Sequence, residues 1–189
     1  LQGPLSSSSL RLKILGKAID KGPDPSLEAQ AQIRPFESWA LGAVDLTTHQ
    51  FDLAALLPGA PRTRLSGHAT VRSQGRREPI SADIELDNAA PARFSDGGLP
   101  FLALRATLKA DPRQPDRLDI GPFVLDAADS RGAAGRWSGS GTWQGDQLEL
   151  QTRLIDLQPS RLDQRLAAMQ LGGPLRIKLL GLPSPNPAA

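Results

Sequence analysis

The sequence of 189 residues predicts an all-β fold, in which a curled antiparallel sheet forms a β-trough of solenoid-like repeats with two short helical caps. Apolar and polar residues alternate with period two in ten segments, which is typical of strands with one apolar face. Gly, Pro, Asn and Asp separate these segments, as they do at turns between strands. A β-sandwich is the alternative, because alternation shows that one face is apolar without showing what covers it.

The first six of the alternating segments lie between residues 10 and 108. In one of them Leu27, Ala29 and Ile33 share a face, while Glu28 and Gln30 lie on the other. Because side chains in a strand point alternately to opposite sides, each segment is expected to bury its apolar side. The strands expected from these six segments are 10–14, 27–33, 44–48, 65–71, 80–86 and 102–108.

The second half continues the pattern, with glycines inside one segment. Gly139 and Gly141 share a face with Trp137 and Trp143. Glycine within a strand indicates a bulge or the close approach of a neighbouring strand, and we expect the tryptophans to cover the glycines. The sequence Gln144-Gly145-Asp146 predicts a short hairpin connection. The strands expected in this half are 118–125, 137–143, 148–154 and 175–179.

Two stretches, Asp52–Pro61 and Pro159–Gln170, replace the alternation with apolar residues three or four apart. We expect a short helix or helical turn in each. Both lead to a Leu-small-Gly element that opens the next strand, Leu65-Ser66-Gly67 in one case and Leu171-Gly172-Gly173 in the other. The two copies indicate an internal repeat with a period of about one hundred residues.

The domain organisation follows from these copies. We interpret residues 1–182 as a single β-rich repeat segment, with repeats at about 10–110 and 111–182, the second incomplete. Residues 183–189 contain only Pro, Ser, Asn and Ala, and are predicted to be a disordered tail or linker.

Composition excludes several kinds of function. The formal net charge of +2 is too small to indicate a nucleic-acid partner. The chain has no Cys, so it has neither disulfides nor thiolate ligands. Its two histidines, His49 and His68, have no carboxylate or second His at ligand spacing, so no metal is expected. No signal peptide or membrane-length apolar run is visible, so any targeting signal is expected outside this chain.

No arrangement of residues indicates catalysis. The carboxylate pair Asp126 and Asp129 lies next to Arg131, and the pair Asp116 and Asp119 flanks Arg117. Glycoside hydrolysis needs two carboxylates across a cleft, whereas these pairs are more typical of solvated ion pairs at turns. The chain is therefore predicted not to be an enzyme, and no cofactor is expected.

A set of segments is similar to the TamB (translocation and assembly module subunit) proteins of the AsmA-like family. The segments are Arg34–Gly42, Asp52–Pro61, Thr63–Gly67, Leu86–Pro91 and the second Leu-Gly-Gly element. The resemblance covers roughly residues 10–182, is carried by structural motifs, and includes no catalytic signature.

This resemblance implies a place in the bacterial cell envelope. Family members are anchored in the inner membrane by an N-terminal helix, span the periplasm as a curled antiparallel sheet with an apolar groove, and pair with an outer-membrane barrel partner. The chain is then an interior segment, connected to the anchor and to the barrel partner through parts of the protein absent from this chain. The implied function is phospholipid transport and outer-membrane biogenesis.

The candidate site is the apolar side of the strands, which is predicted to be a groove for phospholipid acyl chains. Partition of methylene groups onto such a lining needs no specific pocket. The alternative is a scaffold or chaperone-like module that binds outer-membrane protein substrates by strand addition. The predicted lining residues are Leu27, Ala29, Ile33, Ile80, Ile84, Leu86, Leu102, Leu104, Leu108, Leu148, Leu150, Leu154, Leu175 and Ile177.

Overall fold

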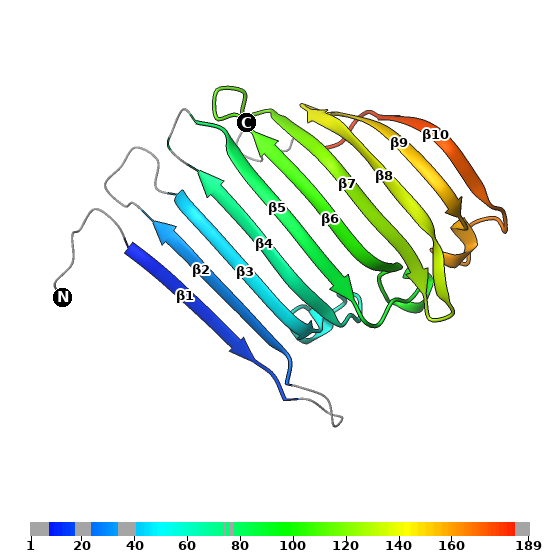
Figure 1. Ribbon diagram of the computed structural model, residues 1–189, viewed down its shortest axis with the longest axis horizontal. Coiled ribbons are helices and arrows are strands. Elements are labelled where there is room, and N and C mark those ends of the chain that lie inside the picture. Colours follow the sequence, from blue (N-terminus) through cyan, green and yellow to red (C-terminus); the bar gives the residue numbers. More distant parts are fainter. Residues whose placement is uncertain (1–7, 18–23, 34–40, 74, 76–77, 184–189) are drawn as a thin grey trace.

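The computed structural model describes residues 8–17, 24–33, 41–73, 75 and 78–183, which form one antiparallel sheet of ten strands. Each strand pairs with the next one in the chain, and the strands lie side by side in chain order (Figure 1). The all-β prediction is confirmed, and the single open, curled sheet replaces the sandwich alternative. The strands are β1 Ser8–Leu15, β2 Ser26–Ile33, β3 Leu41–Phe51, β4 Leu65–Ser73, β5 Ile80–Asn88, β6 Phe101–Ala110, β7 Arg117–Asp129, β8 Gly132–Gln144, β9 Gln147–Leu157 and β10 Leu171–Leu179.

The pairing register aligns the apolar side chains of all ten strands on one face. Residues directly opposite each other in an antiparallel pair point to the same side of the sheet. Following the partners from strand to strand therefore gives continuous rows. One row is Leu12, Ala29, Leu46, Ala69, Ile84, Ala106, Phe123, Gly139, Thr152 and Leu175. The next row is Leu10, Ala31, Val44, Val71, Ala82, Leu108, Ile120, Gly141, Leu150 and Ile177.

The two predicted helical caps are single turns of 3-10 helix, η1 at Leu53–Ala55 and η3 at Pro159–Arg161. The Asp52 side chain accepts a hydrogen bond from the backbone N–H of Ala54, which caps η1. A third turn, η2 at Phe94–Asp96, was not expected from the sequence. Two of its residues, Ser95 and Asp96, belong to a Ser-Asp-Gly-Gly stretch that indicates only a turn, and left-handed Gly97 ends it.

One arrangement of elements occurs twice in the chain, because β3, η1 and β4 are followed later by β9, η3 and β10 in the same order. The displacement between Phe51 and Leu157, at the ends of β3 and β9, equals that between Leu65 and Leu171, at the starts of β4 and β10. The two 3-10 turns follow the same displacement. The connection between β3 and β4 therefore has the same length as the connection between β9 and β10, and its 3-10 turn has the same position. The outer limits of the repeats, at 10–110 and 111–182, stay a prediction.

Each unit contains a bulge where the strand enters its connection. Thr48 pairs with Gly67 and Phe51 pairs with Leu65, so β3 has one more residue than β4 between these pairs. An extra residue normally reverses the faces of the side chains beyond it. The second unit has the same offset between Leu154–Leu157 and Leu171–Gly173.

The extra residues adopt a left-handed backbone conformation, with φ of 47° at Gln50 and 51° at Asp156. This conformation is uncommon for residues other than glycine. It turns the next side chain back to the apolar side, where Phe51 and Leu157 are buried. The left-handed residue in each bulge thus allows the apolar residue that follows it, Phe51 or Leu157, to be buried.

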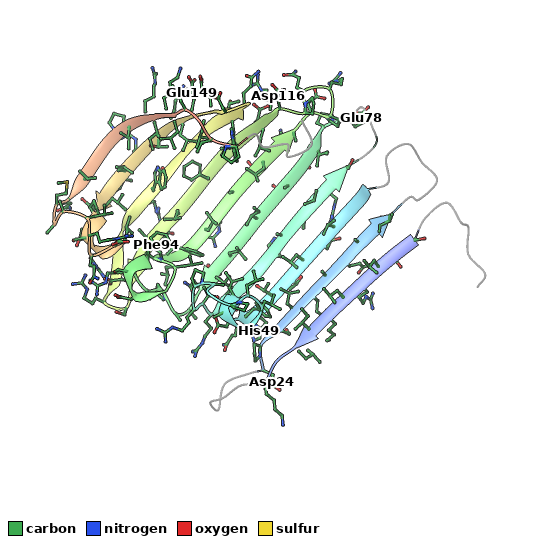
Figure 2. All side chains as sticks on the ribbon, turned by 180° about the vertical axis from the view of Figure 1, so that it is seen from behind. Asp24, His49, Glu78, Phe94, Asp116 and Glu149 are labelled. Atoms are coloured by element: carbon green, nitrogen blue, oxygen red, sulfur yellow. The ribbon has the colours of Figure 1, made fainter. Side chains whose placement is uncertain are left out.

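The three longest described connections, 52–64, 89–100 and 158–170, lie at the same end of the strands and form an end cap. Figure 2 shows Phe94 and His49 at this end, and Glu78, Asp116 and Glu149 at the opposite end. The Arg62 N–H donates to the carbonyl of Gly97 at 2.8 Å, and the Phe94 N–H donates to the carbonyl of Leu162 at 2.9 Å. These bonds link the first connection to the second, and the second to the third.

Asn88 holds the centre of the end cap and is only 1% exposed. Its Oδ1 atom accepts hydrogen bonds from the N–H groups of Arg64 at 3.1 Å and Ala90 at 3.2 Å. Its Nδ2 atom donates to the carbonyl of Leu99 at 3.2 Å. A buried polar group is tolerated when its hydrogen bonds are satisfied, and here one amide satisfies backbone groups of two connections.

The most buried apolar cluster lies beneath the third connection and contains Ala127, Ala134, Leu154 and Leu157. The sheet bends at this side, where β8 to β10 leave the plane of the earlier strands (Figure 1). The end cap therefore covers the apolar side only near one end of the strands. Partly buried residues packed against the cluster are Leu125, Trp137, Leu162 and Leu171.

Close approach of β9 to β8 explains the glycines of β8, as predicted. A Cβ atom on Gly139 would lie 2.4 Å from the carbonyl oxygen of Gln151, and one on Gly141 would lie 2.1 Å from that of Glu149. The nearest side-chain atoms belong to Thr152 and Leu150. These two side chains, rather than the tryptophans, therefore occupy the space that the glycines leave.

Three sequence predictions fall on residues outside the described ranges. They concern residues 34–40 of the first family-like segment, part of the turn between the first two strands, and residues 184–189 of the expected tail.

We expect Gly141→Ala to lower the free energy of unfolding by about 1–3 kcal/mol, because the new methyl group overlaps the backbone of β9. Urea denaturation followed by tryptophan fluorescence measures the change. Gly172→Ala is the control, because its Cβ would lie 3.9 Å from the nearest atom, the Leu154 carbonyl oxygen. Equal stability of the two variants would contradict the close approach.

Candidate functional site

The apolar face is defined here as the side of the sheet that carries the two rows of paired residues given above. The predicted lining residues lie on it with one exception. Leu86 pairs with Leu104, which pairs with Leu125, and so adds a third row between the first row and the end cap. Most of these side chains are half-buried, since they contact their neighbours in the sheet but lie under no second layer of the described chain.

Leu102 departs from the apolar face because of a bulge in β6. Phe101 pairs with Ala127, whereas Ala103 pairs with Asp126, so Leu102 is the extra residue. It is 50% exposed and lines a pocket together with Asp126 and Arg136, which lie on the polar side. Unbroken alternation places Leu102 beside Leu104, and nothing in the sequence marks the bulge.

Exposure on the apolar face decreases from the first strand towards β9. On β1, Leu10 is 61% exposed and Leu12 is 51% exposed. On β9, Leu150 and Leu154 are each 8% exposed. The face is therefore open to solvent at β1, is most buried at β9, and is open again at the other outer strand, where Leu175 is 41% exposed.

Besides Phe51, the aromatic residues Phe123, Trp137 and Trp143 lie on the apolar face and were not among the predicted lining residues. Phe123 contacts Trp137 edge to face, with ring centroids 5.5 Å apart, and Trp143 lies two apolar positions beyond Gly139. The indole nitrogens of both tryptophans are buried and have no hydrogen-bond partner in the described chain. In the sequence, both tryptophans lie an even number of residues from Gly139 and Gly141. This spacing was the signal that could have placed them on the apolar face.

The opposite side of the sheet is the polar face, which carries cross-strand ion pairs. Examples are Lys13 with Glu28 at 2.5 Å and Arg72 with Asp45 at 2.6 Å. These side chains are about half exposed, so water screens the attraction between them and each pair adds little to stability. Their main effect is to keep this side hydrated, so the sheet is amphipathic.

The histidines do not form a metal site. His68 lies on the polar face with its Nε2 atom 4.0 Å from a Glu85 carboxylate oxygen. His49 is an exposed residue of β3. No group of His, Asp and Glu side chains with the arrangement of a metal site occurs among the described residues.

Of these carboxylates, Asp119 has the partner expected from the sequence, whereas Asp126 has a different one. Asp119 pairs with Arg117 at 2.9 Å, and Asp126 pairs with Arg136 at 2.5 Å. Asp129 differs from the prediction of a solvated ion pair, because its side chain is only 2% exposed.

Asp129 connects the hairpin between β7 and β8 to the end cap. Arg161 donates to its Oδ1 atom at 2.5 Å, and Arg131 donates to its Oδ2 atom at 2.9 Å. Arg161 also donates to the backbone carbonyl of Gly132 at 2.8 Å. The hydrogen bond from Arg161, followed by those from Arg131, holds the pKa of Asp129 well below its usual value.

Asp163 has a similar role within the third connection. The guanidinium of Arg165 donates to both carboxylate oxygens, at 2.9 and 2.6 Å. The side-chain hydrogen bonds from Arg165, and then its backbone N–H, lower the pKa of Asp163 to about 2.

No protein-family model, curated protein or solved structure matches the chain. No helix in the described ranges has the length and apolarity needed to cross a bilayer.

We expect the stability of the fold to decrease as pH falls from about 4 towards about 2. Asp129 and Asp163 have a lower pKa in the folded state than in the unfolded chain, so their stabilisation is complete above the unfolded value and is lost as they protonate. Thermal unfolding followed by circular dichroism across this range measures the effect. In Asp129→Asn the profile should be flatter and lower at neutral pH.

Asp83→Asn is the matched control, because Asp83 lies on the polar face and forms no ion pair within the described part of the chain. The assignment to the end cap would be wrong if both variants flattened the profile equally.

Proposed function

We propose that the chain is a structural segment of a periplasm-spanning protein, whose apolar face holds phospholipid acyl chains during transport and outer-membrane biogenesis. The observation that carries this proposal is an apolar face that crosses all ten strands and that the described chain covers only near one end, at the end cap. Monomeric soluble proteins rarely expose so large a continuous apolar surface. Such a surface needs an apolar ligand or partner.

An extended acyl chain fits this surface better than a compact ligand. Neighbouring strands lie about 4.8 Å apart, so ten strands present rows on the order of 40 Å long. Each methylene group that leaves water for such a surface gains about 0.8 kcal/mol. Because the rows offer similar contacts at each strand, an acyl chain can move along them without being held in a deep free-energy minimum.

The location in the envelope rests on the resemblance to the AsmA-like family. Two structural features support it. The β3–η1–β4 unit recurs with the same length, and both outer strands, β1 and β10, have one side free of any described strand. A section of a longer repetitive sheet needs both features. No cofactor, metal or nucleic acid enters the proposal.

We expect the 189-residue chain, exported to a bacterial periplasm, to copurify with phospholipid that native mass spectrometry detects. Leu104→Asn should reduce the bound fraction by about tenfold, because it places an amide in the third row of the apolar face. Leu102→Asn is the matched control on the same strand, since the bulge places Leu102 among polar-face residues.

Equal loss of lipid in the two variants, with both folded, would contradict the assignment to the apolar face. A stable chain that never carries phospholipid would contradict lipid binding itself.

The second candidate function is the binding of outer-membrane protein substrates by strand addition, and the geometry of β1 favours it. This outer strand has eight residues without Pro or Gly, and Leu10, Leu12 and Leu15 are all exposed. By contrast, β10 contains Pro174, which lacks a backbone donor. Arg11 and Lys13 are the charges that protect β1 from non-specific pairing.

For this candidate, proline substitution separates pairing with β2 from pairing with an added strand. The N–H groups of Arg11 and Leu12 point to opposite sides of β1, because successive groups alternate along a strand. One of Arg11→Pro and Leu12→Pro should therefore abolish binding of a strand peptide from an outer-membrane protein and preserve the fold. Fluorescence anisotropy measures the binding. Undiminished binding by both variants excludes addition at β1.

A further inference from the structure

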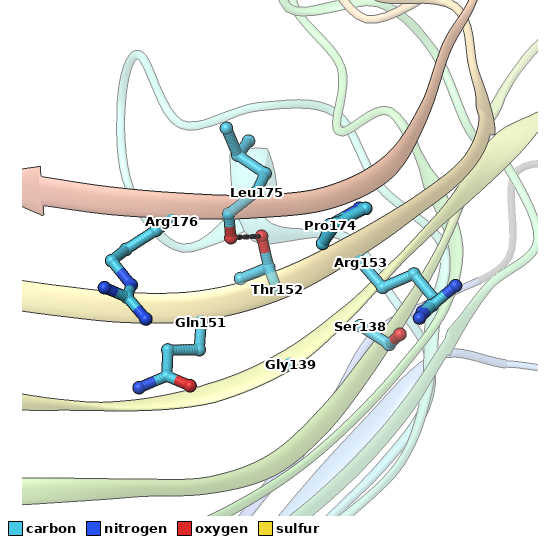
Figure 3. Close-up of a pocket in the computed structure, with 8 residues that line it drawn as sticks. All are labelled: Ser138, Gly139, Gln151, Thr152, Arg153, Pro174, Leu175 and Arg176. Atoms are coloured by element: carbon cyan, nitrogen blue, oxygen red, sulfur yellow. Dashed lines mark hydrogen bonds between the residues drawn. The ribbon is translucent and has the colours of Figure 1, made fainter.

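The polar face contains a pocket of about 630 Å³ over β8, β9 and β10. Figure 3 shows its lining side chains, which include Ser138, Gln151, Arg153, Pro174 and Arg176. We call it the arginine pocket. It lies on the side of the sheet opposite to the apolar face, so its ligand is not determined by the function proposed above.

The register explains why a pocket forms here. Ser138 pairs with Arg153, which pairs with Pro174, while Gln151 pairs with Arg176 on the neighbouring row. Small serine side chains on β8 therefore lie beside long side chains on β9 and β10. The Thr152 hydroxyl turns away from this arrangement and donates to the carbonyl of Leu175 at 3.0 Å.

The charge of the arginine pocket is not balanced by the protein. Arg153 and Arg176 form no ion pair within the described part of the chain, unlike Arg72 and Arg105 elsewhere on the polar face. No acidic residue lines this pocket. In the adjoining pocket, which shares Arg176, the acidic residue Glu149 is paired with Lys178 at 3.1 Å. Both guanidinium groups thus remain uncompensated within the described part of the chain. Figure 3 shows them on either side of Thr152, with Arg153 beside Ser138 and Arg176 beside Gln151.

The lining side chains are hydrogen-bond donors suited to an anion. A guanidinium group presents a planar set of donors that matches the oxygens of phosphate. The hydroxyl of Ser138 and the amide of Gln151 add neutral donors beside the two charges. We infer that the arginine pocket binds a phosphate group, carried either by a free phosphate compound or by the headgroup of a phospholipid.

The test measures binding to the 189-residue chain with two probes, inorganic phosphate by calorimetry and phosphatidylglycerol vesicles by cosedimentation. The variant R153Q/R176Q removes both guanidinium groups. The charge-matched control R11Q/K109Q removes two cations of the polar face that lie outside the pocket and form no ion pair in the described ranges.

We expect R153Q/R176Q to weaken binding by about tenfold or more and the control to change it little. Loss with both probes indicates a site for phosphate itself, whereas loss with vesicles alone indicates a headgroup site. Equal weakening in the two variants would show non-specific attraction to positive charge and would overturn the inference, as would the absence of saturable binding to either probe. Retained phospholipid on the apolar face of R153Q/R176Q keeps this result separate from the function proposed above.

Discussion

The register of the backbone hydrogen-bond ladder is the constraint on which the rest of this structure depends. Ten strands pair only with their neighbours in the chain, so nothing but the register between consecutive strands keeps the apolar residues together. A shift of one residue in a single pair would move that strand's apolar side chains to the polar face. Because the apolar rows run from Leu12 to Leu175 across every pair, each register supports the next. The amphipathic character of the sheet, and both sites proposed for it, follow from this alignment.

The end cap supplies hydrogen-bond partners for backbone groups at the ends of the strands, where the ladder of backbone hydrogen bonds stops. Backbone groups at strand ends lose their partners, and buried groups without partners are costly. The side chains of Asn88 and Asp129 accept hydrogen bonds from such backbone N–H groups. The left-handed residues Gln50 and Asp156 each allow the apolar side chain that follows them to be buried. Asn88 and Asp129, which composition alone would assign to solvated turns, are therefore the most buried polar residues in the described part of the chain.

Sequence alone predicted the ten strands and the two capped connections, because period-two alternation and Leu-small-Gly elements are local signals. It did not predict what depends on non-local geometry. The bulge at Leu102 arises from pairing with Asp126, and the burial of Asp129 arises from Arg161, which lies a whole strand pair further along the chain. The arginine pocket was also invisible, because Arg153 and Arg176 are single polar residues in separate alternating segments. Their proximity appears only when the register of β9 and β10 is known.

All the longest described connections lie at one end of the strands, and this has a consequence for access to the apolar face. At the capped end, Leu162 and its neighbours lie over the apolar cluster, whereas at the other end the described connections between β6 and β7 and between β8 and β9 are short turns. An acyl chain held on the apolar face, as proposed above, would be obstructed by the long connections at the capped end and less so by the short turns at the other end. The two rims of the apolar face therefore differ, with long connections at one and short turns at the other.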